Sequence, residues 1–293
     1  MGDAAESVAR LAARRPFAAA PLLAYLAARA IPGVEEVEGR TVRRALSLPH
    51  APATVALEVG AGGATARLAL GDPRDREAAL AACRALLDLD AEPLEIDAAL
   101  ARDAALAPLV AAAPGLRSPG AAESAEVLFR AIAGQQVSVA AARTVLGRLA
   151  REHGESPAGA RLRPFPSPER LASVDPGRLP MPRARARALV AAASALARGD
   201  LVLDRGADRE AARRALLALP GIGPWTASYV AMRALGDPDV LMVGDLGLDR
   251  GLAALGLPRG RRRIVARAES WRPWRSYATH HLWRAAAGRG GGA

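Results

Sequence analysis

The sequence predicts a mostly α-helical protein, in which a small α+β domain with an antiparallel sheet (residues 1–90) precedes an all-α bundle (91–287) and a flexible tail (288–293). Segments with strand periodicity occur only before residue 91, and about ten amphipathic segments with helical periodicity follow it. Hydrophobic residues make up 51% and charged residues 24% of the 293 residues, which is ordinary for a globular chain long enough to bury a core.

The first part contains a short helix, an antiparallel sheet and a second helix. Residues 22–30 predict a helix that Pro32 and Gly33 end. Three segments alternate approximately with the strand period, and turn residues separate them, so they predict neighbouring strands: 41–48, 53–59 and 64–70. A helix at about 75–88 follows.

Beyond residue 91 helical periodicity recurs between Pro- and Gly-rich turns, and no clear strand pattern is present. We therefore expect a bundle of roughly ten short helices. The predicted helices are 97–112, 121–133, 136–152, 168–174, 183–198, 207–218, 225–235, 246–255, 260–270 and 274–287.

Several classes of protein are excluded or disfavoured. The single cysteine, Cys83, excludes internal disulfides and a four-cysteine iron–sulfur cluster. Charged residues interrupt every apolar stretch, so no membrane span is predicted. The four histidines lack convincing ligand spacing, so we expect no metal site. Asp3 and Glu6 argue against a targeting segment, which predicts a cytoplasmic, nucleoid-associated protein, expected to be a monomer.

The charge indicates an anionic partner. Forty basic residues against 30 acidic ones give a net charge of +10, and all forty are arginine. A compositional bias explains arginine in place of lysine but not the excess over acids, which favours nucleic acid as the partner. A chain without lysine has no side-chain amine that could form a Schiff base.

The segment LPGIGPWTA (219–227) lies between two predicted helices. Gly221 and Gly223 permit a tight hairpin, and Pro224 suits the first turn of the next helix. The amides of the loop and of the helix N-terminus together form a site for a phosphate. A Gly-x-Gly turn alone is weak evidence for a binding site, but the whole string resembles the hairpin of helix-hairpin-helix DNA-binding proteins.

Asp245 precedes a predicted apolar helix, 22 residues beyond Gly223. An aspartate in this place is usually an N-cap, but after a phosphate-binding hairpin it can also face the sugar of a bound nucleotide. All four tryptophans fall between residues 225 and 283, where they fill a helical core or form the walls of a binding pocket. For Asp245 the cap and the sugar-facing carboxylate both remain open, and for the tryptophans the helical core and the pocket wall both remain open.

Together these features resemble the helix-hairpin-helix, Gly/Pro-rich loop and Asp superfamily of base-excision DNA glycosylases, and within it the DNA-3-methyladenine glycosylase II family. The small β-rich N-terminal domain of that family also fits residues 1–90. The stretches that carry the resemblance are LAYLAARAIPGVE (23–35), RAIAGQQVSVAAA (130–142), MPRARARAL (181–189), LPGIGPWTASY (219–229) and WRPWRSYATHHLW (271–283).

The resemblance implies a role for individual residues. Asp245 matches the essential carboxylate. The residue before it is Gly244 rather than a second aspartate, so no pair of carboxylates shares the work. Gln136 matches a wedge that enters the duplex and is apolar in the best-known member. The aromatic walls of the base pocket match Trp225, Tyr229, Trp283 and Tyr25, and the hairpin residues that contact DNA match Gly221, Ile222, Gly223 and Thr226.

The implied activity is hydrolysis of the N-glycosidic bond of alkylated, cationic purines such as 3-methyladenine after base flipping in double-stranded DNA. Electron-rich aromatic rings attract such cations, and their bond is weak enough to need no general acid. Related enzymes that also cut the strand use a lysine where this chain has Trp225, so we expect an abasic product only. No cofactor is expected, although the family suggests a monovalent cation at the hairpin carbonyls.

Two alternatives remain. One is a catalytically silent DNA-binding protein in which Asp245 is only a cap; the other is a glycosylase for deaminated or oxidised bases.

Overall fold

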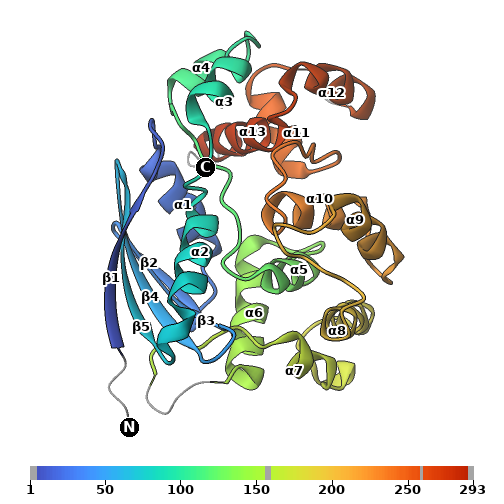
Figure 1. Ribbon diagram of the computed structural model, residues 1–293. Helices are drawn as coiled ribbons and strands as arrows, with labels where there is room; N and C mark the ends of the chain where they lie inside the picture. The colour runs from blue at the N-terminus through green and yellow to red at the C-terminus, as the bar shows by residue number, and fades with distance from the viewer. Residues whose placement is uncertain (1–4, 156–159, 258–259, 290–293) are drawn as a thin grey trace.

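The computed structural model describes residues 5–155, 160–257 and 260–289, and it places an antiparallel sheet beside a larger helical part (Figure 1). The sheet has the strand order β1-β5-β4-β3-β2, and every neighbouring pair is antiparallel. The strands are β1 (Ala5–Ala12), β2 (Glu35–Glu38), β3 (Thr41–Leu46), β4 (Ala53–Gly60) and β5 (Gly63–Leu70).

The three predicted strands are confirmed as β3, β4 and β5, but β1 and β2 were not predicted from the sequence. In β1 the apolar side chain of Val8 is 55% exposed, so polarity does not alternate cleanly along this edge strand. The other edge strand, β2, has the sequence EEVE, and glutamate is depleted in strands. In both cases pairing with a neighbouring strand overrides a weak local preference.

Two helices, α1 (Ala19–Arg29) and α2 (Arg76–Leu87), pack against one face of this sheet (Figure 1). They correspond to the helices predicted at 22–30 and 75–88. Along β4 buried and exposed side chains alternate, so Val55 and Leu57 point to the helices while Thr54 and Glu58 are exposed. The buried side chains of the sheet, α1 and α2 form one hydrophobic core.

The rest of the described chain is helical, as predicted. Its α-helices are α3 (Pro93–Leu100), α4 (Ala107–Ala111), α5 (Ser124–Ala133), α6 (Val139–His153), α7 (Pro168–Ala172), α8 (Arg183–Ala197), α9 (Arg209–Ala218), α10 (Pro224–Arg233), α11 (Leu246–Ala254), α12 (Arg261–Ala268) and α13 (Arg275–Arg289). Short 3-10 turns occupy Pro73–Asp75, Pro176–Arg178 and Glu269–Trp271.

One predicted helix is wrong. The segment 97–112 forms two helices, α3 and α4, because a turn around Asp103 interrupts it. The Asp103 carboxylate accepts hydrogen bonds from the amide of Ala105 (2.9 Å) and from the indole of Trp271 (2.8 Å). Such local bonding by an aspartate competes with continuation of a helix.

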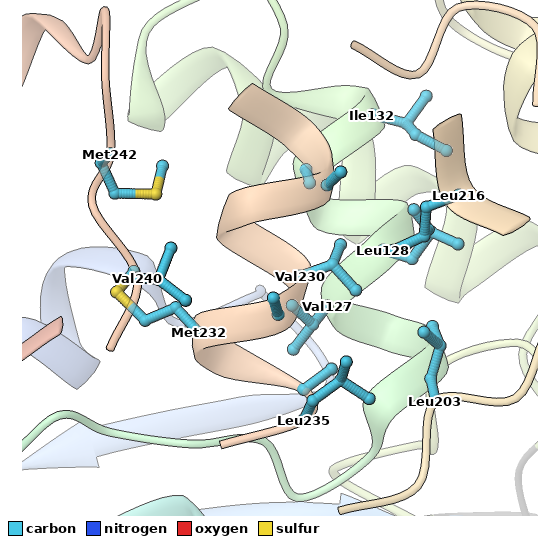
Figure 2. Packing of buried hydrophobic residues seen from close by; sticks show 14 of the residues in the cluster. Val127, Leu128, Ile132, Leu203, Leu216, Val230, Met232, Leu235, Val240 and Met242 are labelled. Atoms are coloured by element: carbon cyan, nitrogen blue, oxygen red, sulfur yellow. The ribbon is translucent and has the colours of Figure 1, made fainter. Parts of the chain in front are cut away.

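A second core lies between the helices, with α10 packed on α5 and α9 (Figure 2). Val127 and Leu128 of α5 meet Val230 of α10 there. Ile31 from the N-terminal part is fully buried in the same core, so it links the two parts. No helix among the described residues is long and apolar enough to span a membrane. Of the predicted tail, residues 288 and 289 belong to α13, and 290–293 lie outside the described residues.

Candidate nucleic-acid-binding active site

The predicted hairpin connects α9 and α10 through residues 219–223. Gly221 has a φ of +77°, and a Cβ there would lie 3.0 Å from the Cβ of Ala188 on α8, so only glycine suits this position. A Cβ on Gly223 would have nothing within 4 Å, so this side of the hairpin faces open space. Pro224 begins α10, and the amides of Trp225 and Thr226 in its first turn have no acceptor within the helix.

Two of the predicted DNA-binding residues hold the hairpin in place. The side chain of Ile222 is 6% exposed, and its amide donates to the carbonyl of Leu219 (3.2 Å). Thr226 is 3% exposed, and Gln135 donates both to its hydroxyl (3.2 Å) and to the carbonyl of Gly221 (2.9 Å). Contact of these residues with DNA stays a prediction. So does a monovalent cation, which would share the Gly221 oxygen with Gln135.

Gln136, the predicted wedge, lies in the turn between α5 and α6. Its φ is +57°, which is uncommon for a residue other than glycine, and its side chain is exposed. The next residue, Val137, is 40% exposed although it is apolar. Both line the same cleft as the hairpin, and the wedge role of Gln136 stays a prediction.

Asp245 makes the helix cap and also contacts two tryptophans. Its Oδ1 accepts from the amide of Leu248 (2.7 Å), which caps α11, and from the indole Nε1 of Trp283 (2.7 Å). Its Oδ2 accepts from Nε1 of Trp225 (3.0 Å). The side chain is 9% exposed, and it lines the cleft. The carboxylate is therefore held in one orientation by helices α10, α11 and α13.

The four aromatic residues that the resemblance implied for the pocket lie together. Trp225 and Tyr229, one turn apart on α10, stack with ring centroids 5.4 Å apart and planes 9° apart. Tyr25 from α1 and Trp283 from α13 are nearly parallel, with centroids 6.4 Å apart. One wall of this pocket thus comes from the N-terminal part of the chain.

Arg233, one turn after Tyr229 on α10, contacts the aromatic cluster. Its Nη1 donates to the hydroxyl oxygens of Tyr25 and Tyr229, the latter at 3.1 Å. Burial raises the pKa of Tyr25 to about 12, although the charge of Arg233 opposes that rise. Burial also acts to raise the pKa of Tyr229, but the charges of Arg233 and Arg29 outweigh it, so this pKa lies below its usual value.

Beneath the pocket a buried ionic network joins the sheet to α5. Arg44 of β3 pairs with Glu35 of β2 (3.2 Å) and with Glu126 of α5 (2.8 Å). Arg130 also pairs with both carboxylates, and it donates to the backbone carbonyl of Arg29 (2.8 Å) at the end of α1. Because α1 carries Tyr25, the network fixes the position of one wall of the pocket.

All these features surround one cleft of about 1260 Å³, which is larger than the roughly 300–1,000 Å³ of an ordinary small-molecule site. The described residues contain no group of three or more His, Cys, Asp or Glu side chains that could hold a metal ion.

Two family models match the chain. Residues 8–123 match the AlkA N-terminal domain, and residues 129–276 match the HhH-GPD superfamily base excision DNA repair protein. The chain belongs to the HhH-GPD superfamily.

Relatives cover nearly the whole of this HhH-GPD chain. It is 48% identical over 277 residues to the probable bifunctional transcriptional activator/DNA repair enzyme AlkA of Mycobacterium tuberculosis, of whose length it spans 56%. It is 37% identical to DNA-3-methyladenine glycosylase 2 of Escherichia coli over 89% of this chain and 92% of that protein. The fold matches a 3-methyladenine DNA-glycosylase from Archaeoglobus fulgidus with a TM-score of 0.81, 22% identity and coverage of 94% and 97%.

The structure of this HhH-GPD protein brings together the carboxylate, the four aromatics and the hairpin that the sequence singled out. Gln135, Arg233 and the network around Arg44 were not predicted from the sequence. Arg233 follows Trp225 and Tyr229 at intervals of four residues, so helical spacing could have placed it on the same face of α10. The contacts of Gln135 with Gly221 and of Arg44 with Glu126 join residues more than 80 positions apart, and no local pattern indicates them.

Proposed function

We propose that this protein is a DNA glycosylase of base excision repair that hydrolyses the N-glycosidic bond of alkylated bases. The observation that carries the proposal is the Asp245 carboxylate, held by two indole N–H groups beside an aromatic cleft. The hairpin supports it because its free amides lie on the rim of the same cleft and suit a phosphate. The identity to a DNA-3-methyladenine glycosylase over most of both chains supports the same activity.

Hydrogen bonding leaves one acceptor position of Asp245 for the substrate. A carboxylate has about four acceptor positions, two on each oxygen. Leu248 and Trp283 occupy those of Oδ1, and Trp225 occupies one on Oδ2. The second position on Oδ2 is the one available to the sugar or to the attacking water.

The reaction needs little more than this carboxylate. An extruded alkylated purine carries a positive charge, so the electron pair of the breaking C1′–N bond neutralises the base as it leaves. Positive charge develops on the sugar, where the fixed charge of Asp245 stabilises it. The oxygen of a water then bonds to C1′ and its proton passes to Asp245 or to solvent, which leaves an abasic site.

We infer that the product strand stays intact. Strand cutting by a glycosylase proceeds through an imine between an amine and the sugar C1′, and this chain contains no lysine. Purified protein on a methylated duplex should therefore give breaks only after alkali or heat, and borohydride should trap no covalent complex. An authentic strand-cutting glycosylase serves as the positive control for trapping. Strand breaks without alkali that disappear in Asp245→Asn would contradict this part of the proposal.

The Asp245→Asn variant tests the glycosylase itself. Asparagine is also a good N-cap, so α11 should keep its cap while the negative charge is lost. We expect single-turnover base release from methylated duplex to fall at least about 100-fold, with affinity for the duplex equal or higher.

Asp249→Asn is the matched control, because it makes the same change one turn later on α11. It should keep base release within about threefold of wild type. A panel of duplexes with alkylated, deaminated or oxidised bases gives the substrate class. Release of no base from any of them, with DNA still bound, would indicate a DNA-binding protein without catalysis.

A further inference from the structure

Arg233 is a buried cation without a carboxylate partner. Its side chain is 7% exposed, and it forms no close ion pair with any residue that the structure describes, although Glu35 attracts it at longer range. Arg44, in contrast, is 2% exposed and pairs with Glu35 and Glu126. Burial of an unpaired charge is costly, so its retention at the bottom of a cleft calls for a functional reason.

The contacts of Arg233 determine where the hydroxyl hydrogens of the pocket point. A guanidinium can only donate, so the hydroxyl oxygens of Tyr25 and Tyr229 both act as acceptors toward it. The hydrogen of the Tyr229 hydroxyl therefore points away from the guanidinium. Because Tyr229 lines the cleft, this hydrogen can be donated to a ligand there.

The charge also affects the ligand. Its third hydrogen bond, to the carbonyl of Gly120 (2.9 Å), holds the guanidinium in place but does not neutralise it. Its Cζ lies 5.0 Å from the ring centroid of Tyr25 and 5.8 Å from that of Tyr229. The guanidinium therefore interacts with the same electron-rich rings that would otherwise attract a cationic base.

We propose that Arg233 is a specificity-determining residue: it orients the Tyr229 hydroxyl as a donor to an acceptor atom of the extruded base, and its unpaired charge opposes a positive charge on that base. This inference rests on the proposed glycosylase function. A cationic base tolerates the repulsion from Arg233, because its N-glycosidic bond is already weak and its release does not depend on tight binding in the ground state. A neutral damaged base with a carbonyl group gains the hydrogen bond and avoids the repulsion.

Three lesions separate charge from hydrogen bonding. Hypoxanthine is neutral with a carbonyl, 7-methylguanine is cationic with a carbonyl, and 3-methyladenine is cationic without one. Relative kcat/KM values are measured on otherwise identical duplexes for wild type and variants. If wild type releases none of these bases, the proposed function fails; the specificity proposal is decided by the ratios among the bases that it releases.

Arg233→Met removes the charge and both contacts to the tyrosine hydroxyls while it keeps an unbranched side chain. We expect the hypoxanthine to 7-methylguanine ratio to fall about tenfold, while the thermal unfolding midpoint is unchanged or higher. Arg233→Lys keeps the charge and should retain most of that ratio. An unchanged ratio in Arg233→Met, or an equal loss for all three lesions, would overturn the proposal.

Tyr229→Phe removes only the hydroxyl. It should lower release of hypoxanthine and 7-methylguanine together, about fivefold relative to 3-methyladenine, because only those two present a carbonyl. Arg29→Met is the matched control for charge, because the Arg29 guanidinium lies 3.9 Å from the Tyr25 ring centroid but donates to neither hydroxyl. A change of ratios in Arg29→Met as large as in Arg233→Met would refute the role of the oriented hydroxyl.

Discussion

Gly247, the second residue of α11, allows Trp283 to reach Asp245. A Cβ at this position would lie 2.8 Å from Cδ1 and 2.9 Å from Nε1 of Trp283, and 3.0 Å from Oδ1 of Asp245. Ordinary contacts of a Cβ begin at 3.4 Å, so the indole would have to move by about 0.6 Å, the difference between 3.4 and 2.8 Å. Such a movement would lengthen the 2.7 Å hydrogen bond between these two residues to as much as about 3.3 Å, beyond the usual range, and so weaken it.

We therefore expect Gly247→Ala to lower the rate of base release about 10- to 100-fold. The estimate lies at or below the roughly 100- to 1,000-fold cost of removing one preorganised donor in other enzymes, because Trp225 and Leu248 still hold the carboxylate. Alanine is a better helix former than glycine by up to about 1 kcal/mol, so a loss of helix stability would not explain a slower reaction.

The assay is single-turnover base release from a methylated duplex, together with thermal unfolding. Gly206→Ala serves as a matched control, because a Cβ there meets nothing within 4 Å. Trp283→Phe removes the indole N–H directly. If Gly247 acts through that donor, the double variant should be no slower than Trp283→Phe alone. A wild-type rate in Gly247→Ala, or losses that multiply in the double variant, would refute the reasoning.

Two other changes test the hairpin and a buried carboxyl. Gln135→Ala should weaken binding of undamaged duplex about 3- to 10-fold, because the hairpin loses the hydrogen bonds that Gln135 donates to Gly221 and Thr226. The slope of log affinity against log salt concentration should not change, since no charge is lost. Fluorescence anisotropy at several salt concentrations measures both the affinity and this slope. Burial raises the pKa of Asp88 to about 6 from 3.8. Its folded pKa exceeds its unfolded pKa, so it stabilises the fold less as pH rises from about 4 to 6, and by pH 8 the loss amounts to about 3 kcal/mol. Asparagine tolerates the left-handed backbone at this position (φ 51°), so Asp88→Asn should raise the unfolding midpoint at pH 8 and not at pH 4; equal midpoints at pH 8 would contradict it.

Local patterns predict the fold where one element determines its own conformation. The alternation along β4 and the Pro and Gly residues around the hairpin act within a few residues, and both are confirmed. Edge strands are harder: β1 and β2 depend on partners at residues 63–70 and 41–44, and their own side chains give no clean period.

In the site, too, local patterns predict some residues, while others depend on distant partners. The resemblance identified the aromatic walls, because those residues lie within continuous recognisable stretches, and it identified Asp245 by its place after the hairpin and before an apolar helix. The two alternatives for Asp245, cap and substrate-facing carboxylate, are compatible in the structure, because its two oxygens serve different partners. Sequence spacing cannot show that Gly247 leaves room for an indole 36 residues further along the chain, since this depends on the packing of α11 against α13.

The double engagement of Asp245 restricts which amino acids can occupy this position. Asparagine, serine and threonine can cap α11 through Leu248, but none of them carries a charge. Glutamate carries the charge, but it is not among the preferred N-caps, and its extra methylene would displace the carboxylate from the two indoles. Aspartate alone satisfies both demands, so no single substitution here can preserve folding and chemistry together. Under the proposed function, substitutions of the surrounding aromatic and arginine side chains can change which base the pocket accepts, whereas position 245 requires aspartate.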